Sequence, residues 1–398
     1  MSFEDVKDTI SNVIDQASSS LRDISLKVHD HPELGNNEFH AYKILTEFLE
    51  GQGFHLTRKA AGMDTAFIAE FSNGSGRRIG FCSEYDALPG VGHGCGHNLI
   101  AISGIACALA MKRLLETGAV KGSVVLFGTP AEESTSGKII FVNSGEVKRR
   151  VDVAMMLHPF ALDGLYARML ALDTLVVEFF GRASHAGMAP WNGVNAVDAI
   201  MQGFDNLAML RQQLLTSNRV HGIITNGGKA ANVIPDFSSA KLYARALTRD
   251  QLAELKPKVE NCFKGAAKST GCQYKMYWAP YGPVDDVFMN APLAECYKTF
   301  MEERGAKFLP RIDEENIHTG STDMGNFSYE VPSIHPAFNI DTTATNHTKE
   351  FADAARTEKA HELTLRAAKC LAMTAANVYL SDNFYHDIVA DFKKGKPQ

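Results

Sequence analysis

The sequence predicts an α/β protein with two domains, and three observations support this prediction. The chain has 398 residues, which is too long for one hydrophobic core of the usual size. In its first part, short apolar segments that look like strands alternate with helical segments, as in a largely parallel sheet flanked by helices. Beyond about residue 172 the order becomes strand, helix, strand, strand, helix, strand, which is typical of a ferredoxin-like domain.

The first part of the chain predicts two amphipathic helices followed by alternating strands and helices. Apolar residues recur at helical spacing over 4–30 and 41–50, and the second helix is expected to end at Gly51. We expect strands at 65–71, 78–86, 123–130 and 151–157, with helices at 99–116 and 137–144. Each strand is followed by a loop that contains His, Cys or Glu, so functional residues are expected at the strand ends.

The second part predicts a small inserted domain. Its strands are expected at 173–181, 221–228, 237–247 and 272–278, and its helices at 195–215 and 249–268. Helical texture returns after Pro283, at 291–304 and 358–379, so the chain is expected to return to the first domain. We therefore predict one catalytic domain made of 1–171 and 286–398, and an inserted ferredoxin-like lid or dimerisation domain at 172–285.

Composition and charge exclude several classes of protein. A net charge of −6 argues against nucleic acid as a partner, because phosphate binding needs a basic surface. No stretch has the roughly 18 consecutive apolar residues of a membrane helix, and the N-terminus lacks the basic start and apolar run of a secretion signal. Seven cysteines without a C-x-x-C pair are typical of reduced thiols. We expect a cytoplasmic protein that binds neither nucleic acid nor membrane.

The segment EYDALPGVGHGCGHNLI, residues 84–100, concentrates metal-binding residue types. Cys95 and His97 form a C-x-H unit, and the glycines at 94 and 96 permit backbone angles that turn both side chains inward. Thiolate and imidazole suit zinc or a similar ion. A redox thiol is the weaker interpretation, since no resolving cysteine stands nearby.

Two further strand ends carry candidate groups. TPAEES, residues 129–134, places Glu132 beside Glu133, so that one can bind a metal while the other acts as general base, although a solvated acidic turn is the alternative. His158 follows the next strand, where a packed histidine is common. Because His97, Glu133 and His158 end successive strand-like segments, we expect them at one rim of one sheet.

Three other histidines remain as candidates. His185 lies in GRASHAGMAPWNG, after the first strand of the small domain. His335 and His347 both lie near the segment GSTDMGN in the last part of the chain, and the residues alone do not rank them as ligands.

In combination these segments resemble a known family. HPELGNNEFHA, EYDALPGVGHGCGHNLI, TPAEES, LHPF, GRASHAGMAPWNG, ANVIPD, GSTDMGN and NHTKEF occur in this order. They resemble the zinc amidohydrolase and metallopeptidase family of aminoacylases, hippurate hydrolase and auxin-conjugate hydrolases. The similarity is greatest to the branch of β-alanyl-lysine dipeptidases and aminobenzoyl-glutamate hydrolases. Better-known relatives have Asp-x-Asp where this chain has Glu84 and Asp86.

The resemblance implies a metal site with two divalent ions that share a bridging donor. The ions are expected to be zinc, with manganese, cobalt or nickel as alternatives. The implied ligands are Cys95, His97, Glu133, His158 and His347. This choice prefers His347 over His335 and leaves His93 as a loop residue or as support behind the ligands.

The resemblance also implies roles for residues around the metals. Glu132 matches the general base, and Asp86 matches an acid that orients a metal-site histidine. His185 matches a cationic group that stabilises the oxyanion, in many relatives from the partner subunit. Asn232 matches a residue that holds the scissile carbonyl or the substrate carboxylate.

The expected activity is metal-dependent hydrolysis of an amide bond in small N-acyl amino acids or β-alanyl-type dipeptides. Arg245 and Lys229 could pair with a substrate carboxylate, although surface charge is the alternative. The alternatives for the whole chain are an aryl or xenobiotic amide hydrolase of the aminobenzoyl-glutamate type, a non-catalytic scaffold, and a thiol-dependent hydrolase that uses Cys95. The resemblance implies a homodimer formed through the inserted domain.

Overall fold

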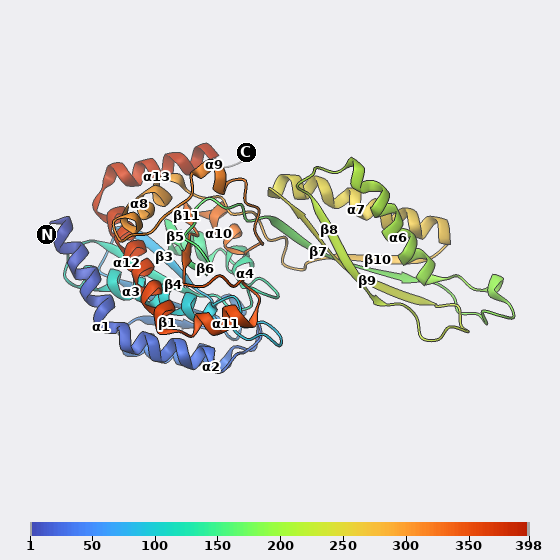
Figure 1. Cartoon of the computed structure of the whole chain (residues 1–398), viewed down its shortest axis with the longest axis horizontal. Coiled ribbons are helices and arrows are strands. Elements are labelled where there is room, and N and C mark those ends of the chain that lie inside the picture. The colour runs from blue at the N-terminus through green and yellow to red at the C-terminus, as the bar shows by residue number, and fades with distance from the viewer. Residues whose placement is uncertain (1, 396–398) are drawn as a thin grey trace. The chain divides into compact units, whose positions relative to one another are not determined.

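Two sheets of different type organise the chain, and the computed structural model describes residues 2–395 (Figure 1). Unit 1 comprises the chain up to Arg168, Val287–His318 and the chain from Thr322 onward. Unit 2 comprises Met169–Asp286 together with the short segment Thr319–Ser321, which returns to it from the last part of the chain.

Unit 1 is built on a six-stranded mixed sheet. Its strands, in spatial order, are β1 (His55–Arg58), β2 (Phe67–Ser72), β4 (Gly122–Gly128), β3 (Arg77–Ser83), β5 (Val153–Met155) and β11 (Ser333–Ile334). The four strands from β4 to β11 run parallel, while β2 pairs antiparallel with both β1 and β4. The loops after the parallel strands therefore meet at one edge of the sheet, as the alternation of strands and helices predicted.

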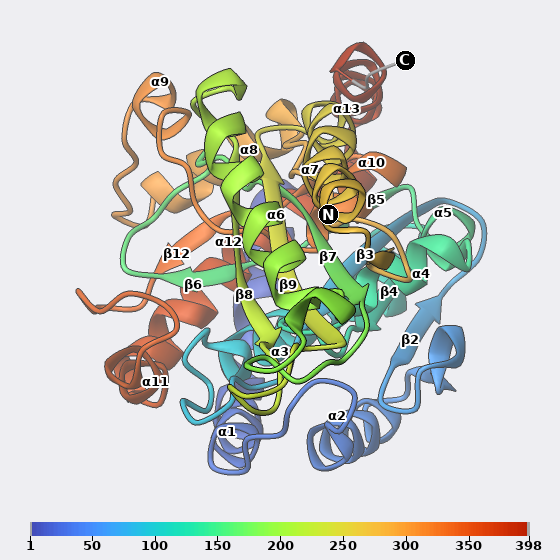
Figure 2. The ribbon, with the colours of Figure 1, turned by 90° about the vertical axis from the view of Figure 1, so that its right-hand side faces the viewer.

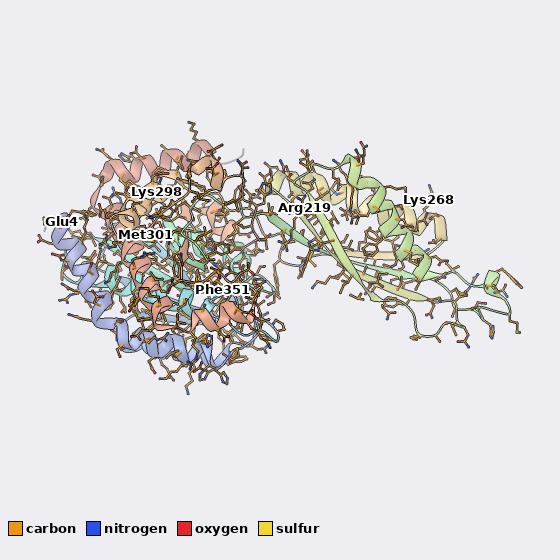
Figure 3. The ribbon with its side chains drawn as sticks, in the orientation of Figure 1. Glu4, Arg219, Lys268, Lys298, Met301 and Phe351 are labelled. Atoms are coloured by element: carbon orange, nitrogen blue, oxygen red, sulfur yellow. The ribbon has the colours of Figure 1, made fainter. Side chains whose placement is uncertain are left out.

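Helices cover both faces of this sheet. The helices of unit 1 are α1 (Phe3–His29), α2 (Phe39–Gly51), α3 (His97–Glu116), α4 (Gly137–Asn143), α5 (Glu146–Arg150), α8 (Ala291–Glu302), α9 (Arg311–Glu314), α10 (Met324–Glu330), α11 (Lys349–Ala355), α12 (Glu358–Leu380) and α13 (Asp382–Gly395). On one face α1, α3 and α12 pack together, and their core extends to Met301 and Phe351, two side chains labelled in Figure 3. On the other face a second cluster joins alternate strand residues to α4 and α10.

Helix α3 is the central helix of unit 1. Nearly all its side chains are buried, because apolar residues occupy its whole circumference. By length and composition α3 could cross a membrane, but 89% of its most apolar window is buried inside the structure. Core helices pass the same test, so this is weak evidence for a membrane span.

The strand predicted at 151–157 is interrupted. β5 ends at Met155, and His158 begins a separate short strand, β6 (His158–Phe160), which pairs with β12 (Ala337–Asn339). Pro159 and Pro336 lack the N–H that a continuous ladder would need. His158 therefore lies in a two-stranded sheet of its own and does not close the main strand.

Unit 2 has the strand and helix order of a ferredoxin-like fold. Its elements are β7 (Ala171–Phe180), α6 (Ala196–Leu210), β8 (Arg219–Asn226), β9 (Phe237–Ala246), α7 (Arg249–Thr270) and β10 (Gln273–Trp278). The sheet order is β10-β7-β9-β8, with every pair antiparallel. Buried residues alternate along β7 and β9 because α6 and α7 cover one face of the sheet (Figure 2).

Candidate metal centre

The C-x-H loop brings its two side chains inward through close backbone packing. Gly96 has φ +76°, and a Cβ there would lie 2.5 Å from Cγ of Pro159. Gly94 accepts a hydrogen bond from the backbone N–H of His347 at 2.8 Å, and a Cβ on Gly94 would lie 3.1 Å from the backbone oxygen of Thr348. Gly94 thus allows the loop to approach the segment of His347, although Gly94 and His347 lie about 250 positions apart in the sequence.

His97 is fully buried and has one nitrogen left for a ligand. Its Nδ1 donates to Oδ1 of Asp86 at 3.0 Å, which leaves the lone pair on Nε2. Asp86 also accepts a hydrogen bond from the backbone N–H of Glu133 at 3.0 Å. The aspartate therefore orients a candidate ligand and fixes the turn that carries another, which is the arrangement expected of it.

His158 and Cys95 face each other in the same region. Nδ1 of His158 donates to the carbonyl oxygen of Pro159 at 2.9 Å, and its Nε2 lies 3.4 Å from Sγ of Cys95. Burial raises the pKa of the Cys95 thiol and lowers that of the His158 imidazole. A raised thiol pKa disfavours the free thiolate that a cysteine nucleophile needs, whereas a bound cation would stabilise the thiolate.

The turn that carries the two glutamates is held from behind. Ala131 has φ +61°, an unfavourable angle for alanine, and its N–H donates to Oε1 of Glu38 at 2.8 Å. Oε2 of Glu132 lies 3.9 Å from Nε2 of His97. Burial raises the pKa of Glu132 well above its usual value, and the neighbouring carboxylates of Glu84 and Glu133 add to this shift.

Glu133 points to the last candidate ligand. Its Oε1 lies 3.2 Å from Nε2 of His347 and 4.0 Å from Nε2 of His97. His347 has φ +70°, which for a non-glycine residue is consistent with a functional constraint on the loop. His335 is fully buried beside His158, with 5.5 Å between the ring centres, and does not belong to any of the candidate ligand groups found among residues 2–395.

These side chains fit a pair of bound cations. Three groups of candidate ligand atoms occur, and within each group the atoms lie within 4.8 Å of one another. They are Cys95–His97–His158, Cys95–Glu133–His347 and Glu84–His97–Glu132. Atoms that share a tetrahedral ion at about 2.1 Å lie about 3.4 Å apart, close to the spacings above. Nε2 of His97 and Oε1 of Glu133 are buried and make no hydrogen bond among residues 2–395, although Oε1 of Glu133 faces His347 at ion-pair distance. Such unpartnered atoms are costly unless a ligand satisfies them.

His185 and Asn232 are exposed in unit 2. Nδ1 of His185 accepts hydrogen bonds from the N–H groups of Gly187 (3.3 Å) and Met188 (3.1 Å), which leaves the proton on Nε2. With Nδ1 engaged in this way, Nε2 is the nitrogen of His185 that can donate to another group. The carbonyl of Asn232 accepts from the N–H of Ala186 at 3.0 Å, so the His185 and Asn232 segments are neighbours.

Arg245 is half-buried on β9. Its Nη1 donates to Oγ of Ser321 at 3.0 Å, and its guanidinium lies 5.8 Å from the ring centre of Tyr243. Within residues 2–395 no carboxylate lies in ion-pair range of Arg245. Lys229, the other candidate, is exposed.

Sequence reasoning assigned no role to Glu38, Lys138 and Asp323, and left Glu84 open. All four are fully buried around the candidate ligands. Glu38, Glu84 and Asp323 stand in motifs that carried the resemblance, which was the available signal. His93, by contrast, donates through Nε2 to the backbone oxygen of Val28 (3.0 Å), and burial lowers its pKa to about 3.

Comparisons with known proteins identify the family of the chain. The model of Peptidase family M20/M25/M40 matches residues 63–369. A human Xaa-Arg dipeptidase is 38% identical over 403 residues, which cover 96% of this chain and 90% of the relative. One subunit of the p-aminobenzoyl-glutamate hydrolase of Escherichia coli is 28% identical over 450 residues, covering 95% of this chain and 93% of the relative.

A solved structure shares the fold. The dinuclear metal-binding peptidase of the M20 family from Bacillus subtilis superposes with a TM-score of 0.67 at 18% identity, covering 92% of this chain and 99% of that one. The family match spans most of the chain, and the dipeptidase is similar along nearly its whole length. The chain thus belongs to Peptidase family M20/M25/M40 and is a metal-dependent hydrolase of amide or peptide bonds.

Proposed function

We propose that the chain hydrolyses the amide bond of small dipeptides or N-acyl amino acids with two zinc ions, and that Glu132 is the general base. The observation that carries this proposal is the set of buried, unpartnered ligand atoms at His97 and Glu133 beside a second carboxylate. The ligands would be Cys95, His97, Glu133, His158 and His347. Cys95 belongs to two of the three ligand groups, so its sulfur is suited to bridge the ions.

Bound ions would polarise the substrate carbonyl and lower the pKa of the attacking water, so that hydroxide forms near neutral pH. Glu132 lies outside the two ligand groups that contain Cys95, and its Oε2 lies 3.9 Å from Nε2 of His97, so we assign it the role of base beside the ions. It can take a proton from the attacking water and return it to the leaving amine. His185 would donate its Nε2–H to the developing oxyanion.

Substrates with a free carboxylate suit the charge of unit 2. Arg245 is half-buried, and burial lowers its pKa, but it contacts a hydroxyl instead of an acid. An Arg in this condition is a good partner for a carboxylate anion. Xaa-Arg dipeptides and aminobenzoyl-glutamate, named by two relatives, both carry such a carboxylate. We propose that Arg245 binds this group and that Asn232 assists it.

The decisive experiment combines metal analysis with a variant of the base. Elemental mass spectrometry gives the ions per chain in the wild type and in Glu132→Gln, with the exposed Glu116→Gln as matched control. Hydrolysis is measured on β-alanyl dipeptides, Xaa-Arg dipeptides, N-acyl amino acids and aminobenzoyl-glutamate. We expect two ions in all three proteins and a loss of about a thousandfold or more in kcat for Glu132→Gln alone.

Other outcomes identify the alternatives. A preference for aminobenzoyl-glutamate would favour the aryl amide hydrolase. A wild type that binds ions and hydrolyses no member of the panel would favour a scaffold. Activity that survives a chelator would favour a thiol mechanism at Cys95 and would contradict the proposal.

We also propose that the chain forms a homodimer through unit 2. β8 is an edge strand of the sheet, and Ile223 and Ile224 on it are exposed. Met201 and Met209 on the adjoining helix α6 are also exposed. An apolar edge strand of this kind needs covering, and a second copy would extend the sheet. Light scattering should give twice the chain mass, and Ile223→Lys should lower it to one chain while Lys268→Glu on α7 leaves it unchanged.

We also propose that the protein is cytoplasmic and does not bind nucleic acid. All seven cysteines are free and six are buried, which suits the reducing cytoplasm. The net charge of −6 supports a protein without nucleic acid as a partner. Imaging of a tagged chain tests the location, and a membrane-bound signal would contradict it.

A further inference from the structure

A buried network of charges lies behind the candidate ligands. Lys138, in the first turn of α4, donates through Nζ to Oδ1 of Asp323 at 2.7 Å and to Oε1 of Glu84. Its backbone N–H donates to Oδ2 of Asp323 at 2.9 Å. All three side chains are 1% exposed or less. Burying three charges is costly, so the network must be closely balanced by its own contacts.

The network fixes one oxygen of Glu84 and leaves the other facing His97. Oε2 of Glu84 lies 3.3 Å from Nε2 of His97. That nitrogen is fully buried and has no hydrogen-bond partner among residues 2–395, since Nδ1 is used by Asp86. The two atoms are therefore close without forming a hydrogen bond. This is the relation expected of two atoms that share an ion, for which the spacing is about 3.4 Å.

Glu84, His97 and Glu132 also form a third group of candidate ligand atoms within 4.8 Å of one another. We propose that Glu84 is an additional ligand of the ion held at His97, and that Lys138 and Asp323 are positioning residues for its carboxylate. The inference rests on the proposed metal centre and adds an oxygen donor to the ion bound by His97, His158 and Cys95.

The length of the side chain matters for this role. The Glu84 side chain is long enough for one carboxylate to reach both Lys138 and the His97 ring. Lys138 lies between Asp323 and Glu84 and contacts both, so it holds the Glu84 carboxyl group in place.

The experiment uses Co²⁺ as the probe, because its visible absorption reports on the number and type of ligands. The dissociation constant of each ion is measured by competition with a chelator. The absorption spectrum is recorded on the cobalt-loaded protein. The variants are Glu84→Gln, Glu84→Asp and the double variant Lys138→Met/Asp323→Asn, which removes one charge of each sign. Lys112→Met, at a surface pair with Glu116, is the matched control.

We expect Glu84→Gln to raise the dissociation constant of one ion about 10- to 100-fold and to change the cobalt spectrum. The dissociation constant of the second ion should stay unchanged. Glu84→Asp and the double variant should shift both readouts in the same direction, and Lys112→Met should shift neither. Far-UV circular dichroism identifies folded variants, and the charge-balanced double variant supplies the readout if Glu84→Gln does not fold.

Two results would contradict the proposal in distinguishable ways. If Glu84→Gln and the double variant keep the dissociation constants and the cobalt spectrum of the wild type, the role of Glu84 is overturned. The metal centre itself would remain. A wild-type chain that binds no ion would overturn the proposed function itself, and this inference with it.

Discussion

The two units place their candidate functional residues in opposite environments. In unit 1, His97, Asp86 and Glu84 are buried, and each contacts other candidate groups of the same unit. In unit 2, His185 lies on an exposed loop, and its ring accepts hydrogen bonds from the N–H groups of Gly187 and Met188 in its own turn. The comparison teaches that unit 1 contains a preorganised charge cluster, whereas unit 2 supplies single donors whose position depends on where the loop is placed.

The largest effect is expected from removing the shared sulfur of unit 1. Cys95→Ser replaces a thiolate with a hydroxyl that does not ionise near neutral pH, so the two ligand groups that contain Cys95 lose a donor. We expect loss of at least one ion by elemental mass spectrometry and a fall in kcat/KM of about a thousandfold or more. Cys296→Ser, at a half-buried thiol outside the site, is the control. Retention of two ions and full activity would show that the sulfur does not bridge.

A smaller effect is expected from His185 in unit 2. His185→Ala should lower kcat by about 10²- to 10³-fold, the value of one oxyanion donor, with metal content unchanged. His185→Gln should restore part of the rate, because its amide N–H can replace the Nε2–H of His185 as a donor. A variant that loses metal, or one that changes KM alone, would contradict the separation between the units.

The pH dependence of stability tests the support behind the catalytic turn. Burial raises the pKa of Glu38 to about 7 from its ordinary value near 4.5. The folded state therefore binds more protons than the unfolded state between these values, and stability falls as pH rises through this window. The shift corresponds to at most about 3 kcal/mol.

Glu38→Gln removes this titration and keeps an oxygen for the N–H of Ala131. The unfolding free energy of the variant, from urea denaturation at pH 5 and pH 8, should depend less on pH than that of the wild type. Glu33→Gln, at a part-buried carboxylate that accepts from the N–H groups of His40 and Ala41, is the control. If the unfolding free energy of Glu38→Gln depends on pH as strongly as that of the wild type, the predicted titration of Glu38 is contradicted.

The smallest effect concerns the structure of unit 2 alone. Lys256 pairs with the buried Asp173 at 2.6 Å and lies 4.4 Å from the ring centre of Trp278. Lys256→Met should destabilise unit 2 by about 1–3 kcal/mol, seen as faster hydrogen exchange in β7 and β10. Lys264→Met, at an exposed pair, should change exchange little. Metal content should stay constant in both, and a loss of metal would show that the units are coupled.

Much of the fold followed from the sequence because periodicity and turn residues are local signals. The α/β class, the largely parallel sheet and the βαββαβ order of unit 2 were all predictable in this way. The break at His158 was missed, because the strand-like run VDVAMML gives no sign that its pairing ends at Met155.

The site was predictable only where a residue type suggests its chemistry. His97, Cys95 and the glutamate pair stand out because His, Cys and adjacent acids are uncommon together. Lys138 does not stand out, since a lysine near a helix start is ordinarily on the surface, and only the fold reveals its contacts with Glu84 and Asp323. Likewise, the hydrogen bonds that assign the proton of His185 depend on turn geometry.

The short segment Thr319–Ser321 has a practical consequence for anyone who wishes to express unit 2 separately. A fragment cut at Met169 and Asp286 would omit Gly320, whose carbonyl accepts from the N–H of Leu170 at 2.9 Å, and Ser321, which holds Arg245. In the excised piece, Leu170 would lack this backbone hydrogen bond and Arg245 would lack its contact with Ser321. A usable recombinant version would need these three residues grafted back through a linker, so this insertion is not a module that can be moved between proteins by simple cutting.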